Sequence, residues 1–309
     1  MSYNFTKATQ LLALTKDHQV SISEIAIEYE METKARTREE ILKRSKSVLS
    51  AMGKAILDAK DERKESVTGL VGGDAYIFNE YLKSPKKKEM FMSDIALHAM
   101  VWSMATNETN ACSHCIVACP TAGSAGIVPA SLYAARDRLK LSEEVMVAGL
   151  LNTSAIGLII EENAMMSGAE GGCQSEDGSA AAMAASGITE MRGGTPEQCL
   201  DAAALSLKNV LGLVCDPVGG LVEVPCIKRT TFMVMNAFTA SDLAIGGVTS
   251  KVPFDEVVDA LRRVGEAMPR ELRETALGGL ATTPTGLRVK AEMAERKNQN
   301  DAARKKATG

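Results

Sequence analysis

The feature that most limits the fold of this chain is a series of helix-start signals, each followed by apolar residues three or four positions apart. Thr37 with Glu40 has capping-box spacing, Ser21 with Glu24 repeats it, and Thr195-Pro-Glu-Gln198 adds proline at the first turn. The apolar residues that follow lie on one face of an amphipathic helix. Because no long segment alternates with period two, we predict a mostly α-helical fold with little sheet.

The 309 residues allow one large domain or two modest ones. We predict a single helical domain over residues 1–289. The last residues, 290–309, are polar and charged, and we predict that they form a C-terminal tail that is either a frayed helix or disordered.

Charge and apolar patterning exclude several classes of protein. The net charge is −4 and no basic stripe is present, which argues against a nucleic-acid partner. The most apolar stretch, 145–160, is interrupted by Asn152 and ended by Glu161, so we interpret it as a buried core helix and not a membrane span. The N-terminus lacks a secretory pattern. We therefore expect a cytoplasmic protein whose seven cysteines are free, catalytic or metal-bound.

A first cysteine group has metal-like local spacing. Cys112, Cys115 and Cys119 form a C-x2-C-x3-C pattern that is followed by proline, and His114 offers a fourth ligand. The alternative is three small hydrophobic residues near a turn. Spacing alone leaves both interpretations open.

A second group is scattered along the chain. Cys173, Cys215 and Cys226 each lie near glycine or proline, where the chain leaves regular structure, and such loops can bring distant residues together. Three thiolates on a four-iron cluster would leave one iron open to a substrate hydroxyl. Spacing alone favours the alternative of three ordinary buried cysteines. Cys199 lies inside the helix that begins after Thr195, and we expect it to serve packing.

Long, ordered stretches of the chain match one known family. They include 69–75, 105–108, 120–126, 163–164, 167–169, 171–174, 193–198, 211–217, 220–226, 273–275 and 278–281. On these stretches the sequence resembles the alpha subunit of bacterial iron–sulfur L-serine dehydratases.

The resemblance implies a cofactor and a reaction. The family's cluster cysteines fall on Cys173, Cys215 and Cys226, which implies a four-iron four-sulfur cluster in a helical catalytic domain. It implies dehydration and deamination of L-serine to pyruvate and ammonia, with the open iron as Lewis acid and without pyridoxal phosphate. Such a lyase would act in amino-acid catabolism and gluconeogenesis.

Three polar residues in the matching stretches are candidates for substrate contacts: Thr121, Asn163 and Ser167. The alternative role for all three is to cap helices or to satisfy backbone groups. We expect Glu176 and Asp216 to support the cysteines or to cap helices, and not to act as bases.

The catalytic base is not assigned, since the only histidines, His18, His98 and His114, lie outside the best-matching stretches. Two-subunit members of the family keep a Ser-His-Thr substrate motif on a separate beta chain. The only Ser-His pair here is Ser113–His114, which is followed by Cys115. We therefore predict that a beta subunit completes the site.

One departure from the family bears on the substrate. The family usually has serine where this chain has Met165, which removes a hydroxyl and adds bulk. The substrate is thus L-serine or a related small amino acid. The alternatives are a related lyase, such as a cysteine desulfidase or a dehydratase of another hydroxy-amino acid, and a non-catalytic iron–sulfur redox sensor that uses Cys112, Cys115 and Cys119.

Overall fold

The structure is a computed structural model that describes residues 2–66 and 68–308, with side chains in these ranges up to residue 296. Its α-helices are α1 (Ala8–His18), α2 (Ile22–Lys34), α3 (Arg38–Lys60), α4 (Asp74–Leu82), α5 (Asp94–Ala111), α6 (Ile127–Leu139), α7 (Glu143–Asn163), α8 (Gly168–Gly171), α9 (Cys173–Met191), α10 (Pro196–Lys208), α11 (Cys226–Ile245), α12 (Phe254–Ala267) and α13 (Pro284–Thr308). Short 3-10 helices are η1 (Pro85–Glu89), η2 (Val218–Gly220), η3 (Arg270–Leu272) and η4 (Gly279–Thr282). Across these residues the extended pairing is limited to an isolated bridge between Cys215 and Arg273, so the predicted mostly α fold is confirmed.

The predicted helix starts are found where the capping pattern placed them. At α3 the Thr37 side chain accepts a hydrogen bond from the Glu40 amide, and the Glu40 carboxylate accepts one from the Thr37 amide. Gln198 completes the same reciprocal pair with Thr195 at α10. At α2, Ser21 caps the helix through the Glu24 amide. These bonds satisfy amides that the first helical turn leaves without intrahelical partners.

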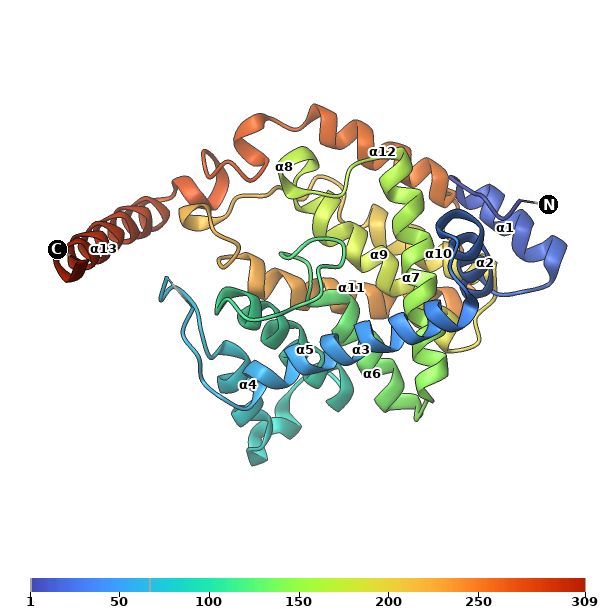
Figure 1. Cartoon of the computed structure of the whole chain (residues 1–309), viewed down its shortest axis with the longest axis horizontal. Coiled ribbons are helices and arrows are strands. Elements are labelled where there is room, and N and C mark those ends of the chain that lie inside the picture. Colours follow the sequence, from blue (N-terminus) through green and yellow to red (C-terminus); the bar gives the residue numbers. More distant parts are fainter. Residues whose placement is uncertain (1, 67, 309) are drawn as a thin grey trace.

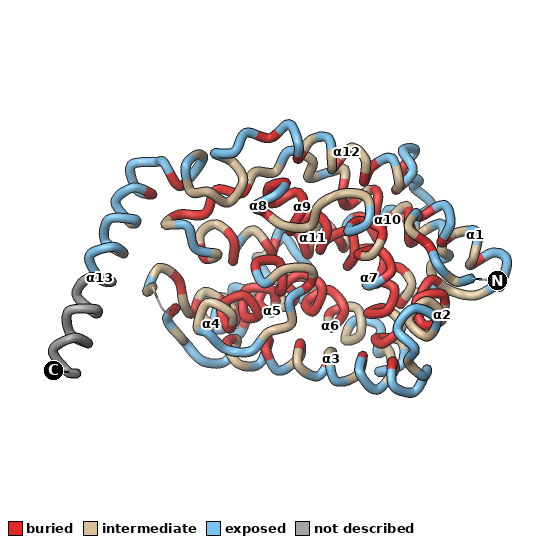
Figure 2. Tube along the Cα trace, turned by 45° about the horizontal axis from the view of Figure 1, so that its top comes forward, coloured by how far each residue is buried: buried red, intermediate tan, exposed pale blue. Residues whose placement is uncertain are grey.

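Helix α9 is the centre of the fold (Figure 1). Every residue of α9 except Glu190 is buried, and α6, α7, α10 and α11 all contact it. Small residues such as the run Ala180–Ala182 allow neighbouring helices to approach closely. Figure 2 shows the resulting buried interior beneath an exposed outer layer.

The apolar stretch 145–160 lies within α7, which packs against α9 and α2. In the described part of the chain α7 is the helix long and apolar enough to cross a membrane, by length and composition only, and 67% of its most apolar window is buried. Such burial is typical of a helix in the core of a globular domain.

Local structure at both ends sets the bounds of helix α5, Asp94 and Ala111. Residues 85–89 form η1, and Met90 and Ser93 have extended backbones, so the helix begins only at Asp94. At the other end Thr109 is buried and donates a hydrogen bond to the Ala55 carbonyl of α3 at 2.8 Å, which keeps the last turn helical.

The C-terminal helix α13 projects from the body (Figure 1). It is continuous across the predicted boundary between residues 289 and 290, and Arg296 donates a hydrogen bond to the Thr68 carbonyl at 2.9 Å. The side chains of 297–309, most of the predicted tail, lie outside the described residues, and the division into domain and tail stays a prediction.

Candidate metal centre

Two thiols and a carboxylate gather where α9 begins. The Sγ atoms of Cys173 and Cys215 and a carboxylate oxygen of Glu176 lie within 4.8 Å of one another, and all three residues are buried. Throughout the described ranges, no other three His, Cys, Asp or Glu side chains bring ligand atoms this close together.

The start of α9 brings the two cysteines together across 42 positions of sequence. Cys173 follows Gly172, whose backbone angles of 78° and 179° belong to a region that only glycine adopts readily. The Gln174 amide then donates to the Leu213 carbonyl at 2.9 Å. This bond ties the loop that carries Cys215 to the first turn of α9.

A second segment crosses Cys215 from the C-terminal side. The Cys215 amide donates to the Leu272 carbonyl at 2.8 Å, and the Glu274 amide donates to the Cys215 carbonyl at 2.9 Å. The bridge places the Glu274 side chain beside the thiols.

Gly168, the first residue of α8, leaves space between these groups. A Cβ at Gly168 would lie 3.0 Å from Cys215 Sγ, 3.1 Å from Glu176 Oε2 and 3.2 Å from Glu274 Oε2. One thiol and two carboxylates therefore face the same point, which glycine keeps free of a side chain.

Arg229 of α11 supplies the positive charge of the site. It donates to Cys173 Sγ at 3.2 Å, to the Val214 carbonyl at 2.9 Å and to Asp216 Oδ1 at 3.2 Å. The other oxygen of Asp216 accepts the Leu280 amide at 2.8 Å. Arg229 thus joins a thiol to the loop of Cys215, and Asp216 joins both to η4.

The two close thiols differ in acidity. A hydrogen bond from Cys215, together with the charge and hydrogen bond of Arg229, lowers the pKa of Cys173, although burial opposes this. The same pairing and burial raise the pKa of Cys215. Cys173 is therefore the thiol that most readily becomes a thiolate.

Cys226, the third predicted ligand, begins α11 and is 7% exposed. Burial raises its pKa, and the charges of Cys173 and Asp177 raise it further, so Cys226 lies in the surroundings of the pair. Its sulfur lies outside the group of three atoms within 4.8 Å. As ligands, Cys173, Cys215 and Cys226 stay a prediction.

Thr121 reaches the site through Glu176. Its hydroxyl donates a hydrogen bond to Glu176 Oε1. Burial raises the pKa of Glu176, and the nearby charge of Glu274 adds to the rise. Burial also raises the pKa of Asp177 well above its ordinary value. A cation at this point would offset the cost of burying these carboxylates.

Two other predicted contact residues bond to the backbone of the protein itself. The side-chain Nδ2 of Asn163 donates to the carbonyls of Thr6 at 2.6 Å and Ile159 at 2.8 Å. Ser167 caps α8 through the Glu170 amide. Their role as substrate contacts stays a prediction.

Met165 lies at a helix contact. Its Sδ would be 2.5 Å from a Cβ at Gly171 and 2.7 Å from one at Gly265. The side chain therefore fills the space between α8 and α12.

The first cysteine group is dispersed. Cys112 is half-buried and approaches the Glu65 carbonyl at 3.3 Å, Cys115 and His114 are exposed, and Cys119 is buried. They form no group of three close ligand atoms in the part of the chain that the structure describes. Burial raises the pKa of Cys119 to about 12, so its thiol stays protonated at neutral pH.

The donor set around Cys173 fits an iron–sulfur group. Thiolates are the ligands of iron–sulfur clusters, and hydrogen bonds to the sulfurs adjust their redox potential. The buried thiols Cys173, Cys215 and Cys226 provide such ligands, and Arg229 provides a hydrogen bond to one sulfur.

Sequence reasoning missed Arg229, Glu274 and Gly168. Arg229 stands three positions after Cys226, on the same face of α11, which is a spacing that could have drawn attention to it. Glu274 and Gly168 stand in stretches that match the family, but nothing in their local sequence indicates contact with a cysteine.

Comparisons with known proteins point to one family. A family model described as serine dehydratase alpha chain matches residues 17–281. The chain is 46% identical over 289 residues to the probable L-serine dehydratase alpha chain of Bacillus subtilis strain 168, covering 94% of this chain and 95% of that one. It is 41% identical over 286 residues to the L-serine dehydratase alpha chain of Peptoniphilus asaccharolyticus, covering 93% and 97%.

A longer relative is the L-serine dehydratase of Streptomyces coelicolor. Identity is 37% over 287 residues, which is 91% of this chain but 61% of that one. That relative therefore contains a large segment without counterpart in the matched region.

Proposed function

Because this chain belongs to the serine dehydratase alpha-chain family, we propose that it is a lyase that dehydrates and deaminates L-serine to pyruvate and ammonia. The observation that carries the proposal is the buried group of Cys173, Glu176 and Cys215, with Arg229 bonded to the Cys173 sulfur. Such a group suits metal chemistry better than a packing role, because it buries one carboxylate together with two thiols.

The proposed cofactor is a four-iron four-sulfur cluster held by Cys173, Cys215 and Cys226. When bound, it supplies a Lewis acid that stabilises the charge developing on the departing hydroxide. This route requires no pyridoxal phosphate.

The residues of this chain have four tasks in the proposal. Arg229 holds the Cys173 sulfur and favours its thiolate form. Thr121 orients Glu176 through its hydroxyl. Glu176 and Glu274 face the space beside Gly168, where their oxygens are placed to accept or return a proton, a role for Glu176 that differs from the expectation from sequence. Gly168, Glu176 and Cys215 are buried and Glu274 is half-buried, which limits the access of water to this space.

The proposal includes a beta subunit. The Streptomyces coelicolor relative continues well beyond the part that this chain matches, and the two relatives named alpha chains have nearly the length of this one. The only Ser-His pair, Ser113–His114, is exposed and lies outside the group of close ligand atoms. A separate beta chain would supply the missing substrate contacts. We place the enzyme in the cytoplasm, and its product pyruvate would enter gluconeogenesis.

The test of the cofactor is anaerobic reconstitution of the purified chain with iron and sulfide. We expect about four irons and four sulfides per chain. Cys173→Ser, Cys215→Ser and Cys226→Ser should each lose most of the cluster absorbance, while Cys112→Ser and Cys115→Ser retain it. Retention in the first set with loss in the second would contradict the assignment and favour a redox sensor that uses the exposed group.

The test of the substrate is a panel of L-serine, L-threonine and L-cysteine with the reconstituted chain, alone and with a beta chain added. Pyruvate from L-serine that depends on the added chain supports the whole proposal. Full turnover by this chain alone would contradict the beta subunit, and preference for L-cysteine or L-threonine would correct the substrate. Met165→Ser tests whether that position affects the choice, since it restores the residue usual in the family.

A further inference from the structure

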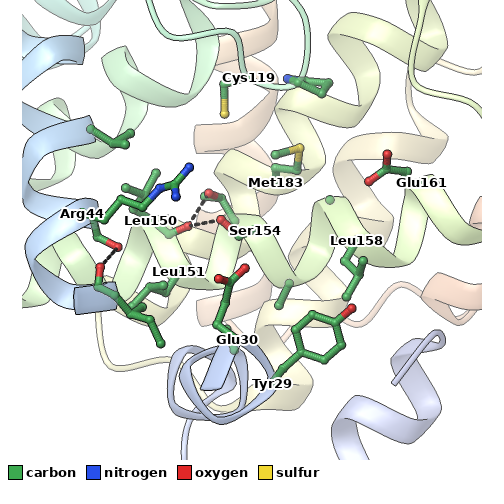
Figure 3. A pocket seen from close by; sticks show the side chains of 18 of the residues that line it. Tyr29, Glu30, Arg44, Cys119, Leu150, Leu151, Ser154, Leu158, Glu161 and Met183 are labelled. Atoms are coloured by element: carbon green, nitrogen blue, oxygen red, sulfur yellow. Dashed lines mark hydrogen bonds between the residues drawn. The ribbon is translucent and has the colours of Figure 1, made fainter. Parts of the chain in front are cut away.

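A cavity distinct from the thiol site lies between α2, α3, α7 and the segment 117–120 (Figure 3). Its volume is about 510 Å³, within the roughly 300–1,000 Å³ usual for small-molecule sites. Most of its walls are apolar, with Val48, Val117, Leu151 and Met183 among them. A concave, mostly apolar space with a few polar groups is the usual form of a ligand site.

The charged side chains around the cavity give it a small positive excess. They are Lys34, Arg36, Arg44, Glu30 and Glu161. Arg36 and Glu30 form an ion pair at 2.7 Å and neutralise each other. Arg44, an exposed residue of α3, extends toward the cavity from its rim (Figure 3), and it forms no hydrogen bond or ion pair with any residue that the structure describes. A solvent-accessible guanidinium without a counter-ion, at the edge of an apolar cavity, is available to bind an anion.

The donors available in the cavity indicate which anion. The Arg44 guanidinium has the planar fork that binds both oxygens of a carboxylate. The Tyr29 hydroxyl, which also lacks a hydrogen-bond partner among the described residues, is a second donor on the wall formed by α2. The walls around them offer apolar contact and few further hydrogen bonds.

We propose that this cavity binds a small carboxylic acid with an apolar body, its carboxylate on Arg44 and its body against α7 and the 117–120 segment. The ligand is distinct from serine, because a hydroxymethyl side chain would leave the apolar walls without contact.

A short segment, residues 117–121, links the cavity to the thiol site. Figure 3 shows the Cys119 thiol pointing into the cavity. The Cys119 amide donates to the Thr121 carbonyl at 3.1 Å, and the Thr121 hydroxyl donates to Glu176. Met183 lies on α9, the helix that also carries Glu176. A ligand bound against residues 117–120 would thereby be coupled to the position of Glu176, so the proposed site would be regulatory.

The test is calorimetric titration of the full chain without metal, with 4-methyl-2-oxopentanoate as the probe. We expect saturable binding at one site. Pyruvate, which lacks the apolar body, and 4-methylpentan-2-one, which lacks the carboxylate, should each bind about tenfold or more weakly. Because binding is measured without turnover, its outcome does not depend on the serine dehydratase activity.

Two variants and one control locate the site. Arg44→Gln should weaken binding about tenfold or more, whereas Arg263→Gln, an exposed arginine of α12 outside the cavity, should leave it unchanged. Val117→Trp fills the space without changing charge and should abolish binding while the circular dichroism spectrum is kept. No saturable binding of the probe, or equal binding by all three variants, would overturn the proposal.

Hydrogen exchange tests the link to the thiol site. The probe should slow amide exchange of the peptide spanning 117–121 in the wild-type chain, and it should not do so in Arg44→Gln at the same concentration. Unchanged exchange of this peptide at saturating probe would overturn the regulatory part of the proposal.

Discussion

Replacing Arg229 with methionine should destabilise the chain even without a cofactor. The change removes hydrogen bonds to Cys173 Sγ, the Val214 carbonyl and Asp216 Oδ1. It leaves Asp216, whose side chain is 5% exposed, with only the Leu280 amide as a hydrogen-bond partner in the described ranges. Breaking a buried charge pair from one side costs about 3–5 kcal/mol. Because the Arg229 side chain is 14% exposed, we expect the lower end, about 3 kcal/mol.

A double-mutant cycle separates the stranded charge from lost packing. Asp216→Asn alone should cost about 1–2 kcal/mol, since Arg229 keeps its other two bonds. The double variant should be more stable than the sum of the single changes by at least about 1 kcal/mol, because no charge is then left unpaired. Urea unfolding of the metal-free chain at pH 7.5 with reductant, followed by circular dichroism, measures these free energies.

The control for this cycle is Arg262→Met, which breaks surface ion pairs with Asp259 and Glu266. The Arg262 side chain is 39% exposed, so the change should cost less than about 1 kcal/mol. If Arg229→Met also costs less than about 1 kcal/mol and the cycle shows no coupling, the reasoning about a buried ion pair at the thiol site is refuted.

Three further changes test separate parts of the structure. Gly168→Ala places a Cβ within 3.2 Å of a thiol and two carboxylates, so it should lower the iron content after reconstitution. The control Gly157→Ala meets only flexible methionine side chains at 3.1 Å or more and should bind iron normally. Equal iron contents in the two variants would contradict the assignment of this space to the metal site. Burial raises the pKa of Glu108 from 4.5 to about 7, so its contribution to stability is fully present below pH 4.5 and is lost as pH rises through about 7. Glu108→Gln should therefore make the unfolding free energy depend less on pH across this range. The same pH dependence in the variant and the wild-type chain would contradict the shift. Thr195→Ala removes the cap of α10 and should lower the unfolding free energy by about 1 kcal/mol in urea, with no loss expected for Thr195→Ser, which keeps the hydroxyl.

Helix starts could be predicted because their causes are local. The reciprocal bonds of Thr37 with Glu40 and of Thr195 with Gln198 involve residues three positions apart, so the spacing alone indicates them. The start of α5 could not be placed in this way. It depends on the extended backbone at Met90 and Ser93, and the pattern of apolar residues does not indicate this backbone conformation.

The candidate site, in contrast to the helix starts, could not be predicted from local spacing. Cys112, Cys115 and Cys119 have the best local spacing for a metal, yet the structure disperses them, because the backbone after α5 turns through Ser113 at a positive φ of 61° and buries only Cys119. Family resemblance directed attention to the scattered cysteines instead.

Long-range bonds assemble the site, and no local pattern contains them. Cys173 and Cys215 lie close together because the Gln174 amide donates a hydrogen bond to the Leu213 carbonyl. Glu274 lies beside them because its neighbour Arg273 forms the isolated bridge with Cys215. The charge of Arg229 arrives from a third element, α11. Such residues become apparent only when the chain path is known.

The burial of α9 has a consequence for how the protein withstands damage. Cys173 and Glu176 belong to the first turn of a helix that is buried except at Glu190, so packing in the interior holds their backbone positions without help from a metal. Loss of the proposed cluster would therefore leave the thiols in place and the chain folded. The proposed cluster could then be rebuilt on the folded chain from iron, sulfide and reductant, without new synthesis of the protein.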